Sequence, residues 1–169
     1  MFQRILLALD AGDTGPVATS FTIALARSSG AAVQVVHVNE YLAGGRGVAC
    51  ESEVDAVSVV ARAMQDMEEA GVHAAGATYR TATFDVPAAI CDLAEQCRAD
   101  VIVLGSRRRR LRSLVRRSMR DRITRRTQLP VVVAPAPLRV DRRERAIESL
   151  PAFFDLAPCD SPRAADREP

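Results

Sequence analysis

The stretch from Gly105 to Arg126 contains the residues whose types and spacing best suit the binding of an anion. It has the sequence GSRRRRLRSLVRRSMRDRITRR, with eleven arginines. Its glycine directly follows the apolar run Val101 to Leu104, which is typical of a strand end where backbone amides and a helix N-terminus face a phosphate. Guanidinium groups also bind phosphate through paired hydrogen bonds. The sequence therefore leaves two interpretations open: a dedicated anion site, or a solvated arginine-rich face of a helix.

The same stretch predicts an amphipathic helix, because its apolar residues recur three and four positions apart. These residues are Leu111, Leu114, Val115, Met119 and Ile123. They fall on one helical face, so most of the arginines lie on the others.

Charge is strongly segregated along the chain. The segment Arg107 to Arg126 has eleven arginines and one aspartate, a net charge of +10, whereas the whole chain carries only +2 and the remainder therefore −8. A concentrated positive field attracts anions of any class, so the candidate partners are phosphate ligands, nucleic acid and acidic proteins. The segment contains no aromatic side chain on which a single-stranded base could stack, which disfavours specific single-strand recognition.

Residues suited to catalysis or metal binding are sparse. The cysteines are Cys50, Cys91, Cys97 and Cys159, and the histidines are His37 and His73. Their spacing matches no metal-ligand pattern, and we find no nucleophile with a partner base and no paired carboxylates. We therefore expect no resident metal and no enzymatic activity. A histidine that alternates toward a sheet face, as His37 does, is expected to be structural.

No segment predicts secretion or membrane insertion. The N-terminal apolar run Ile5 to Leu9 is short and ends at Asp10, unlike a secretory signal. No stretch approaches the ~20 apolar residues that span a bilayer. On one helix, Cys91 and Cys97 would be separated by about 9 Å of rise, beyond disulfide reach. We therefore expect reduced thiols and a cytoplasmic location.

The segments that must position these residues alternate between strand-like and helix-like patterns. The expected strands are Arg4 to Leu9, Ala32 to Val38, Val72 to Arg80 near a sheet edge, Val101 to Leu104 and Pro130 to Ala134. The expected helices run from Pro16 to Gly30, from Glu51 to Ala70, from Asp85 to about Arg98, and through the arginine-rich stretch. This alternation predicts an α/β fold: a doubly wound, Rossmann-like, five-stranded parallel sheet with helices on both faces.

Helical spacing also predicts which residues pack on the sheet. For the first helix these are Val17, Phe21, Ala24 and Leu25, and for the second they are Val54, Val57, Ala61, Met64 and Met67. Asn39 to Ala49 is expected to be a flexible loop, since its glycines lack the spacing of a phosphate loop. The domain is expected to cover residues 1–137, followed over 138–169 by a charged, proline-containing tail predicted to be disordered.

Ligands of such sheets bind at the carboxyl ends of the strands. Asp10 ends the first strand and Gly105 follows the fourth. The two residues would lie together if these strands are neighbours that flank the point where the strand order reverses.

From Phe2 to about Ala136, the sequence resembles the universal stress protein family. The matching segments are RILLALD for the opening strand, VVHVNE for the second strand, TATFDVPAAICDLAEQCRADVIVLGSR for the approach to a glycine motif, and RSMRDRITRRTQLPVVVAP for the closing helix and strand. The resemblance implies a doubly wound dimer, commonly formed through the last strand, here Val131, Val132 and Val133. It also implies binding of ATP or a related adenine nucleotide in many members, with Mg²⁺ only beside the phosphates.

The resemblance further implies which residues bind the nucleotide. They are Ala8, Asp10, Val38, Leu104, Gly105, Ser106, Arg107, Ser118 and Met119. In the family motif Gly-x-x-Gly, nine residues, Gly-Ser/Thr, the second and third glycines correspond here to Arg108 and Arg117, in a segment one residue shorter. Arginine adds bulk where glycine lets a phosphate approach the backbone, although its side chain can itself bind phosphate.

Two functions follow from these residues. In the first, the protein serves in stress response or signalling and binds the nucleotide as a regulatory ligand. In the second, it binds no nucleotide and is a dimeric interaction module whose surface from Arg107 to Arg126 meets an acidic protein or nucleic acid. Slow ATP hydrolysis remains open under the first.

Overall fold

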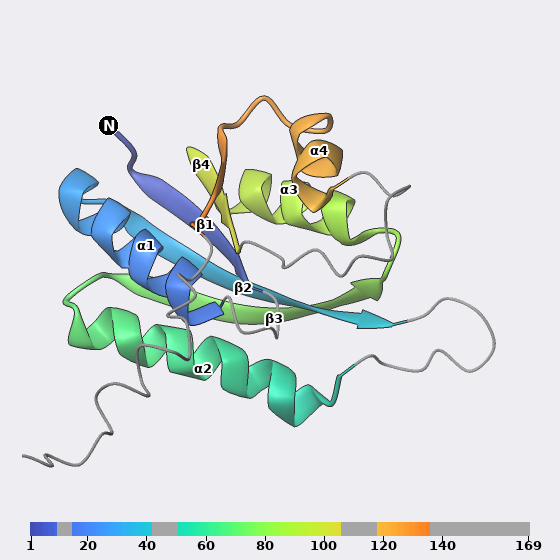
Figure 1. The fold of residues 1–169 in the computed structure, drawn as a ribbon, viewed down its shortest axis with the longest axis horizontal. Coiled ribbons are helices and arrows are strands. Elements are labelled where there is room, and N and C mark those ends of the chain that lie inside the picture. The colour runs from blue at the N-terminus through green and yellow to red at the C-terminus, as the bar shows by residue number, and fades with distance from the viewer. Residues whose placement is uncertain (10–14, 42–50, 106–117, 136–169) are drawn as a thin grey trace, which may run out of the picture. The chain divides into compact units, whose positions relative to one another are not determined.

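The described part of the chain is built on a five-stranded parallel sheet (Figure 1). The computed structural model describes residues 1–9, 15–41, 51–105 and 118–135. The strands are β1 (Arg4–Leu9), β2 (Ala32–Tyr41), β3 (Ala74–Ala82), β4 (Val101–Leu104) and β5 (Val131–Val133), in the order β3-β2-β1-β4-β5. All four pairings are parallel, which confirms the predicted fold class.

Helices cover both faces of the sheet (Figure 1). On one face lie α1 (Gly15–Ser29) and α2 (Glu53–Glu69), and on the other α3 (Val86–Gln96) and α4 (Met119–Thr124). Strand β1 supplies both cores, because successive side chains of a strand point to opposite faces. Ile5 and Leu7 pack under α1 and α2, whereas Leu6 and Ala8 pack under α3. This two-sided burial explains why β1 is a continuous apolar run.

Helix α1 packs on the sheet through smaller residues than the sequence predicts. Its buried residues are Ala18, Thr19, Thr22 and Ala26, whereas Val17, Phe21 and Leu25 are only partly buried and Ala24 is exposed. Small side chains let the helix approach the strands closely. The hydroxyl of Thr22 donates to the carbonyl of Ala18 at 2.8 Å, which satisfies its polar group inside the core. The prediction is therefore correct for Phe21 and Leu25, which pack against the margin of the core, and wrong for Ala24.

Helix α2 shows the same difference. Its buried residues are Ala56, Val60, Ala63 and Met67. Of the predicted inward face only Met67 is buried and Met64 partly so, while Ala61 is exposed and Val54 and Val57 are 78% and 51% exposed. The helix begins at its N-cap Ser52, whose side chain accepts a hydrogen bond from the amide of Asp55.

Strand β2 extends farther than predicted, since residues from Asn39 to Tyr41 continue the strand rather than begin a loop. They pair with β3 as far as Tyr41 opposite Ala82, whereas the last β1 pairing is Leu9 opposite His37. The four residues beyond His37 thus project by about 13 Å past the end of β1 (Figure 1). The carboxyl edge of the sheet is therefore stepped. Strand β3 lies at the sheet edge, as predicted.

Candidate functional site

The carboxyl ends of β1 and β4 lie side by side at the point where the strand order reverses. Ala8 pairs with Leu104, so the chain segments that follow, beginning at Asp10 and Gly105, leave the sheet from adjacent strands. This confirms the expected neighbourhood of the first and fourth strands. Ala8 and Leu104 themselves are buried in the core below α3. In an open α/β sheet this position is where ligands bind.

The predicted site residues divide into two groups. Asp10, Ser106 and Arg107 lie outside the described residues, as do Arg108 and Arg117 of the altered glycine motif. The structure places the remaining predicted residues around the carboxyl edge: Ala8, Val38, Leu104, Gly105, Ser118 and Met119. Val38 is buried and is the first β2 residue beyond the last pairing with β1. Val38 therefore lies where β2 begins to extend beyond the end of β1.

Ser118 begins helix α4. Its Oγ accepts a hydrogen bond from the amide of Asp121 at 3.2 Å, which makes it the N-cap. The hydrogen bonds from Ser118 hold the pKa of the exposed Asp121 carboxyl below its usual value. Met119 is partly buried against the core, and Ile123 is completely buried. For these two residues the predicted inward face of the helix is correct, and the three predicted residues before them lie outside the described residues.

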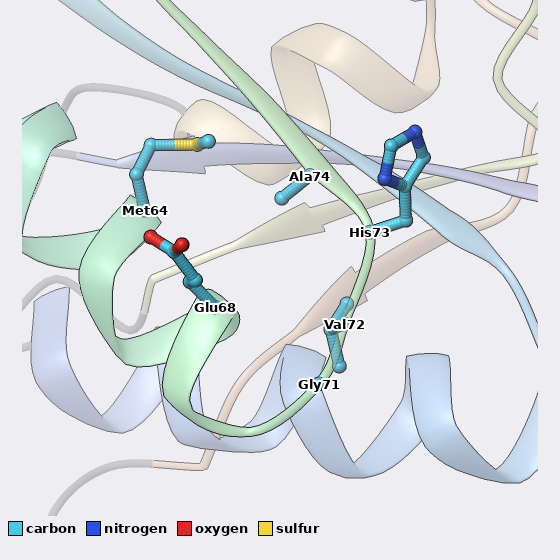
Figure 2. Close-up of a pocket in the computed structure, with 6 residues that line it drawn as sticks. All are labelled: Met64, Glu68, Gly71, Val72, His73 and Ala74. Carbon is cyan, nitrogen blue, oxygen red and sulfur yellow. The ribbon is translucent and has the colours of Figure 1, made fainter.

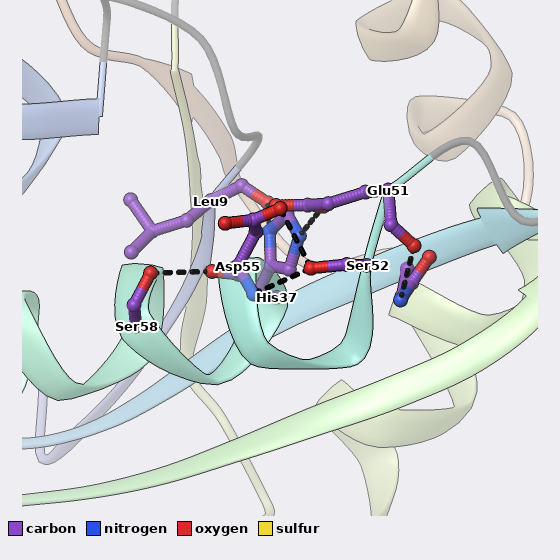
Figure 3. A network of polar contacts seen from close by, with 7 residues as sticks. Leu9, His37, Glu51, Ser52, Asp55 and Ser58 are labelled. Carbon is purple, nitrogen blue, oxygen red and sulfur yellow. Dashed lines mark hydrogen bonds and ion pairs between the residues drawn. The ribbon is translucent and has the colours of Figure 1, made fainter.

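A buried histidine joins the end of β1 to the start of α2 (Figure 3). His37 is 2% exposed. Its Nδ1 lies 3.0 Å from the carbonyl oxygen of Leu9 and its Nε2 lies 2.7 Å from Oε2 of Glu51. A carbonyl only accepts, so Nδ1 carries a proton. His37 therefore fixes the last residue of β1 before Asp10, a structural role consistent with the expectation for this histidine.

Asn39 is a candidate site residue that the sequence did not reveal. It is 7% exposed, and its Nδ2 donates to the backbone carbonyl of Glu51 at 3.4 Å. Within the part of the chain that the structure describes, its Oδ1 has no hydrogen-bond partner. The strand alternation that places His37 on the α2 face also places Asn39 there, two residues closer to the carboxyl edge. The alternation of the strand could have indicated Asn39 as a buried residue. The sequence prediction missed it because it assigned the chain from Asn39 onward to a loop.

Cationic side chains gather on α4 and the turn after it. Arg120, Arg125 and Arg126 are exposed, and Arg122 donates to the carbonyl of Phe84 at 2.7 Å, which ties α4 to the turn before α3. This described part of the arginine-rich stretch follows β4. The carboxyl edge therefore has carboxylate and amide oxygens at β2 and Glu51, whereas the exposed arginines run from the start of α4 at this edge to the turn that leads to the amino end of β5.

A hollow lies elsewhere on the described part of the chain, at the amino-terminal end of β3 (Figure 2). It has a volume of about 400 Å³ and is lined by Met64, Glu68, Gly71, Val72, His73 and Ala74. None of the predicted site residues lines it. Ligands of parallel sheets bind at the opposite edge, so this hollow is not the candidate nucleotide site.

Other site classes find little support in the described ranges. Across residues 1–9, 15–41, 51–105 and 118–135, no group of three or more metal-ligating side chains comes together, and no helix is long and apolar enough to cross a bilayer. Burial raises the pKa of both the Cys91 and the Cys97 thiols. A raised thiol pKa lowers the population of the reactive thiolate at neutral pH.

Comparisons with known proteins agree with this arrangement. The model of the universal stress protein family matches residues 1–135. A protein of that family from Burkholderia pseudomallei is 23% identical, with a TM-score of 0.63, over 79% of this chain and 96% of its own. The Archaeoglobus fulgidus universal stress protein in complex with dAMP is 22% identical, with a TM-score of 0.60, over 79% and 98%.

An Arabidopsis thaliana family protein with AMP bound is 17% identical, with a TM-score of 0.56, over 79% of this chain and 93% of its own. No protein with a curated function is significantly similar in sequence. At these identities the structural likeness shows the fold, whereas the family match covers most of the sequence. The chain belongs to the universal stress protein family.

Proposed function

We propose that this protein binds an adenine nucleotide at the carboxyl ends of β1 and β4 and uses it as a regulatory ligand in stress response or signalling. The observation that carries the proposal is the pairing of Ala8 with Leu104, which brings the two chain segments of the predicted site to adjacent strands. Family relatives with the same fold hold dAMP, AMP or cAMP. The proposed location is the cytoplasm.

The residues at this edge suit a ligand with one donor-bearing end and one anionic end. Asn39 supplies a buried oxygen acceptor near β2. Gly105 and Ser118 flank the arginine-rich segment that follows β4, and in our proposal they bind the phosphates together with Ser106 and Arg107. ATP is the proposed ligand, with Mg²⁺ present only as its counterion. A regulatory rather than enzymatic role fits the absence of a nucleophile with a partner base from the sequence.

Calorimetric titration of the folded protein with ATP, ADP, AMP and cyclic AMP tests the proposal. We expect saturable binding of at least one of them, and mass spectrometry should detect adenine nucleotide in the purified protein. Failure of all four to bind at millimolar concentration would exclude the proposal. Arg108 and Arg117 offer a second variable: if their guanidinium groups replace the family's glycine contacts, a double Arg→Gly variant will bind ATP less tightly than the wild type.

A second candidate function is an interaction module, favoured by the exposed Arg120, Arg125 and Arg126 on and after α4. Its partner would be an acidic protein or nucleic acid. Contacts with nucleic-acid phosphates weaken steeply with salt, so a gel shift that persists at high salt would contradict the nucleic-acid version. Binding of an acidic polypeptide without any nucleotide binding would favour this second function over the first.

Dimerisation through β5 is part of both functions. β5 is an edge strand, with Val131 and Val132 partly buried and Val133 37% exposed. Exposed apolar edge strands are natural pairing surfaces. Sedimentation velocity of the wild type and of Val133→Arg tests this: we expect a dimer that the substitution weakens, and a wild-type monomer would refute it. The folded unit is proposed to end near residue 137; the tail predicted over residues 138–169 lies outside the described residues.

A further inference from the structure

We propose that Asn39 selects the ligand of this site by accepting a hydrogen bond from the exocyclic amino group of the base, so that a 6-aminopurine binds in preference to a 6-oxopurine. This inference rests on the proposed nucleotide binding and adds a specificity residue to it. It starts from a single structural fact: a side-chain oxygen at the carboxyl edge is buried and has no partner among the described residues.

The orientation of the Asn39 amide follows from its neighbour. The backbone carbonyl of Glu51 lies 3.4 Å from Nδ2 and can only accept a hydrogen bond. Rotating the amide by half a turn would place two oxygens against each other, so Nδ2 stays on Glu51 and Oδ1 is the atom left over. Buried polar atoms in native proteins are nearly always hydrogen-bonded. A ligand that brings a donor to Oδ1 therefore gains an interaction for which the protein is already organised.

The buried histidine keeps this acceptor in place. His37 holds the carboxylate of Glu51 at 2.7 Å and the carbonyl of Leu9 at 3.0 Å (Figure 3). The Glu51 residue that orients the Asn39 amide is thus itself fixed to the end of β1. His37 is a positioning residue in this arrangement, and Asn39 is the group that touches the ligand.

Charge identifies which end of a nucleotide meets Asn39. A phosphate has only acceptor oxygens and a negative charge, and it would therefore be repelled by the acceptor Oδ1 of Asn39. The exposed Arg120 lies in the first turn of α4, the helix that follows β4, and attracts phosphates to that side of the edge. The base therefore faces β2. Of the purine groups at position 6, an amino group donates, whereas an oxo group would set an acceptor against the acceptor of Asn39.

A cycle that changes one group on the protein and one on the ligand tests the inference. Wild type and Asn39→Leu are each titrated with AMP, with dAMP, with IMP and with purine riboside monophosphate, which lacks the amino group. Asn39→Leu removes the acceptor at similar volume. Gln34→Leu is the matched control, because it removes an amide from the same strand near its amino end, away from the site.

We expect wild type and Gln34→Leu to bind AMP about tenfold more tightly than purine riboside monophosphate, which is the range of a buried hydrogen bond. IMP should bind more weakly still. Asn39→Leu should bind AMP and purine riboside monophosphate equally. If it does not fold, the comparison of the ligands on the wild type still tests the preference for the amino group.

Three results overturn the inference. If the wild type binds AMP and purine riboside monophosphate with equal affinity, the site does not recognise the amino group. If Asn39→Leu keeps the wild-type preference for AMP over purine riboside monophosphate, Asn39 does not recognise the amino group. If Asn39→Leu loses only the preference for AMP over dAMP, Asn39 contacts the ribose hydroxyl and not the base. In each of these cases the nucleotide still binds and the proposed function stands, whereas a wild type that binds no nucleotide refutes both.

Discussion

Replacing His37 by phenylalanine should destabilise the protein by about 3 kcal/mol. The ring keeps its volume, so the loss comes from polar groups. The Leu9 carbonyl loses its hydrogen bond from Nδ1 of His37. Because residue 37 is only 2% exposed, the carbonyl is left without this partner in a buried place, which costs about 1–3 kcal/mol. The Glu51 side chain is 16% exposed, so its carboxylate can turn to water at a cost of about 1 kcal/mol.

Urea unfolding followed by circular dichroism measures this loss as a lower midpoint at unchanged slope. For a chain of this length, about 3 kcal/mol corresponds to a fall in Tm of roughly 6–12 °C. Nucleotide affinity should fall as well, because the end of β1 before Asp10 and the residue that orients Asn39 both lose their anchor.

Two variants serve as controls. In Glu51→Gln the side-chain amide can donate to Nε2 while Nδ1 still donates to Leu9, so we expect a loss below about 1 kcal/mol. His73→Phe changes an exposed histidine and should stay within about 0.5 kcal/mol of the wild type. A loss below about 1 kcal/mol in His37→Phe would show that the two contacts do not stabilise the fold.

Three other changes test separate parts of the structure. The Asp100 carboxylate accepts two backbone hydrogen bonds before and at the start of β1, at 2.6 and 2.8 Å, which holds its pKa below the usual 3.8. A folded-state pKa below the unfolded one stabilises the protein above the unfolded pKa and loses this contribution as the pH falls through the folded value. Urea midpoints between about pH 2 and 6 should therefore depend less on pH in Asp100→Asn than in the wild type, and equal pH dependence would contradict this. Ser118→Ala should cost about 1 kcal/mol in a thermal melt through loss of the α4 cap, whereas Ser118→Asp should keep the cap. If Ser118 also meets a phosphate, calorimetry will show weaker ATP binding by Ser118→Asp, and unchanged affinity would limit this residue to capping. Gly76→Val should cost about 1–3 kcal/mol in urea, because a Cβ at Gly76 would lie 2.5 Å from Cγ1 of Val60, and a midpoint equal to that of the wild type would show that α2 moves away freely.

The sequence predicted best those elements whose residue pattern has a single physical cause. The apolar runs of β1 and β4 are buried on both faces, and no other element of a small α/β domain needs such a run. Gly30 and Gly71 end their helices as expected, with φ of +71° and +70°. The family resemblance rested on the order of such segments and is confirmed by the match over residues 1–135.

The errors arose where the sequence pattern carries less information. The inward faces of α1 and α2 were predicted from large apolar residues, whereas close packing on the sheet selects small ones such as Ala18 and Ala56. The end of β2 was predicted too early, because Asn39 to Tyr41 are polar or bulky and resemble a loop. Strand pairing with β3 decides their conformation, and a partner strand cannot be read from a local window.

The candidate site was predictable only in its location. The order of strands and helices indicates the carboxyl edge, and the resemblance indicates Val38, Gly105 and Ser118. The contact between Asn39 and Glu51 joins residues twelve positions apart, through the start of a helix whose first turn is set by a cap. No spacing rule anticipates that contact. The roles of Asp10 and of the arginines between Ser106 and Ser118 remain predictions.

The stepped edge also has a consequence for local opening. Beyond His37 the described sheet consists of β2 and β3 alone, so the amides there belong to a two-stranded ribbon, whereas those of β1 and β4 lie inside the sheet. Such regions open more readily, and their amides exchange with solvent before those of the core. A ligand bound to Asn39 would hold this ribbon closed. Slower hydrogen exchange from Val38 to Tyr41, with little change in β4, would then report occupancy of the base end of the site.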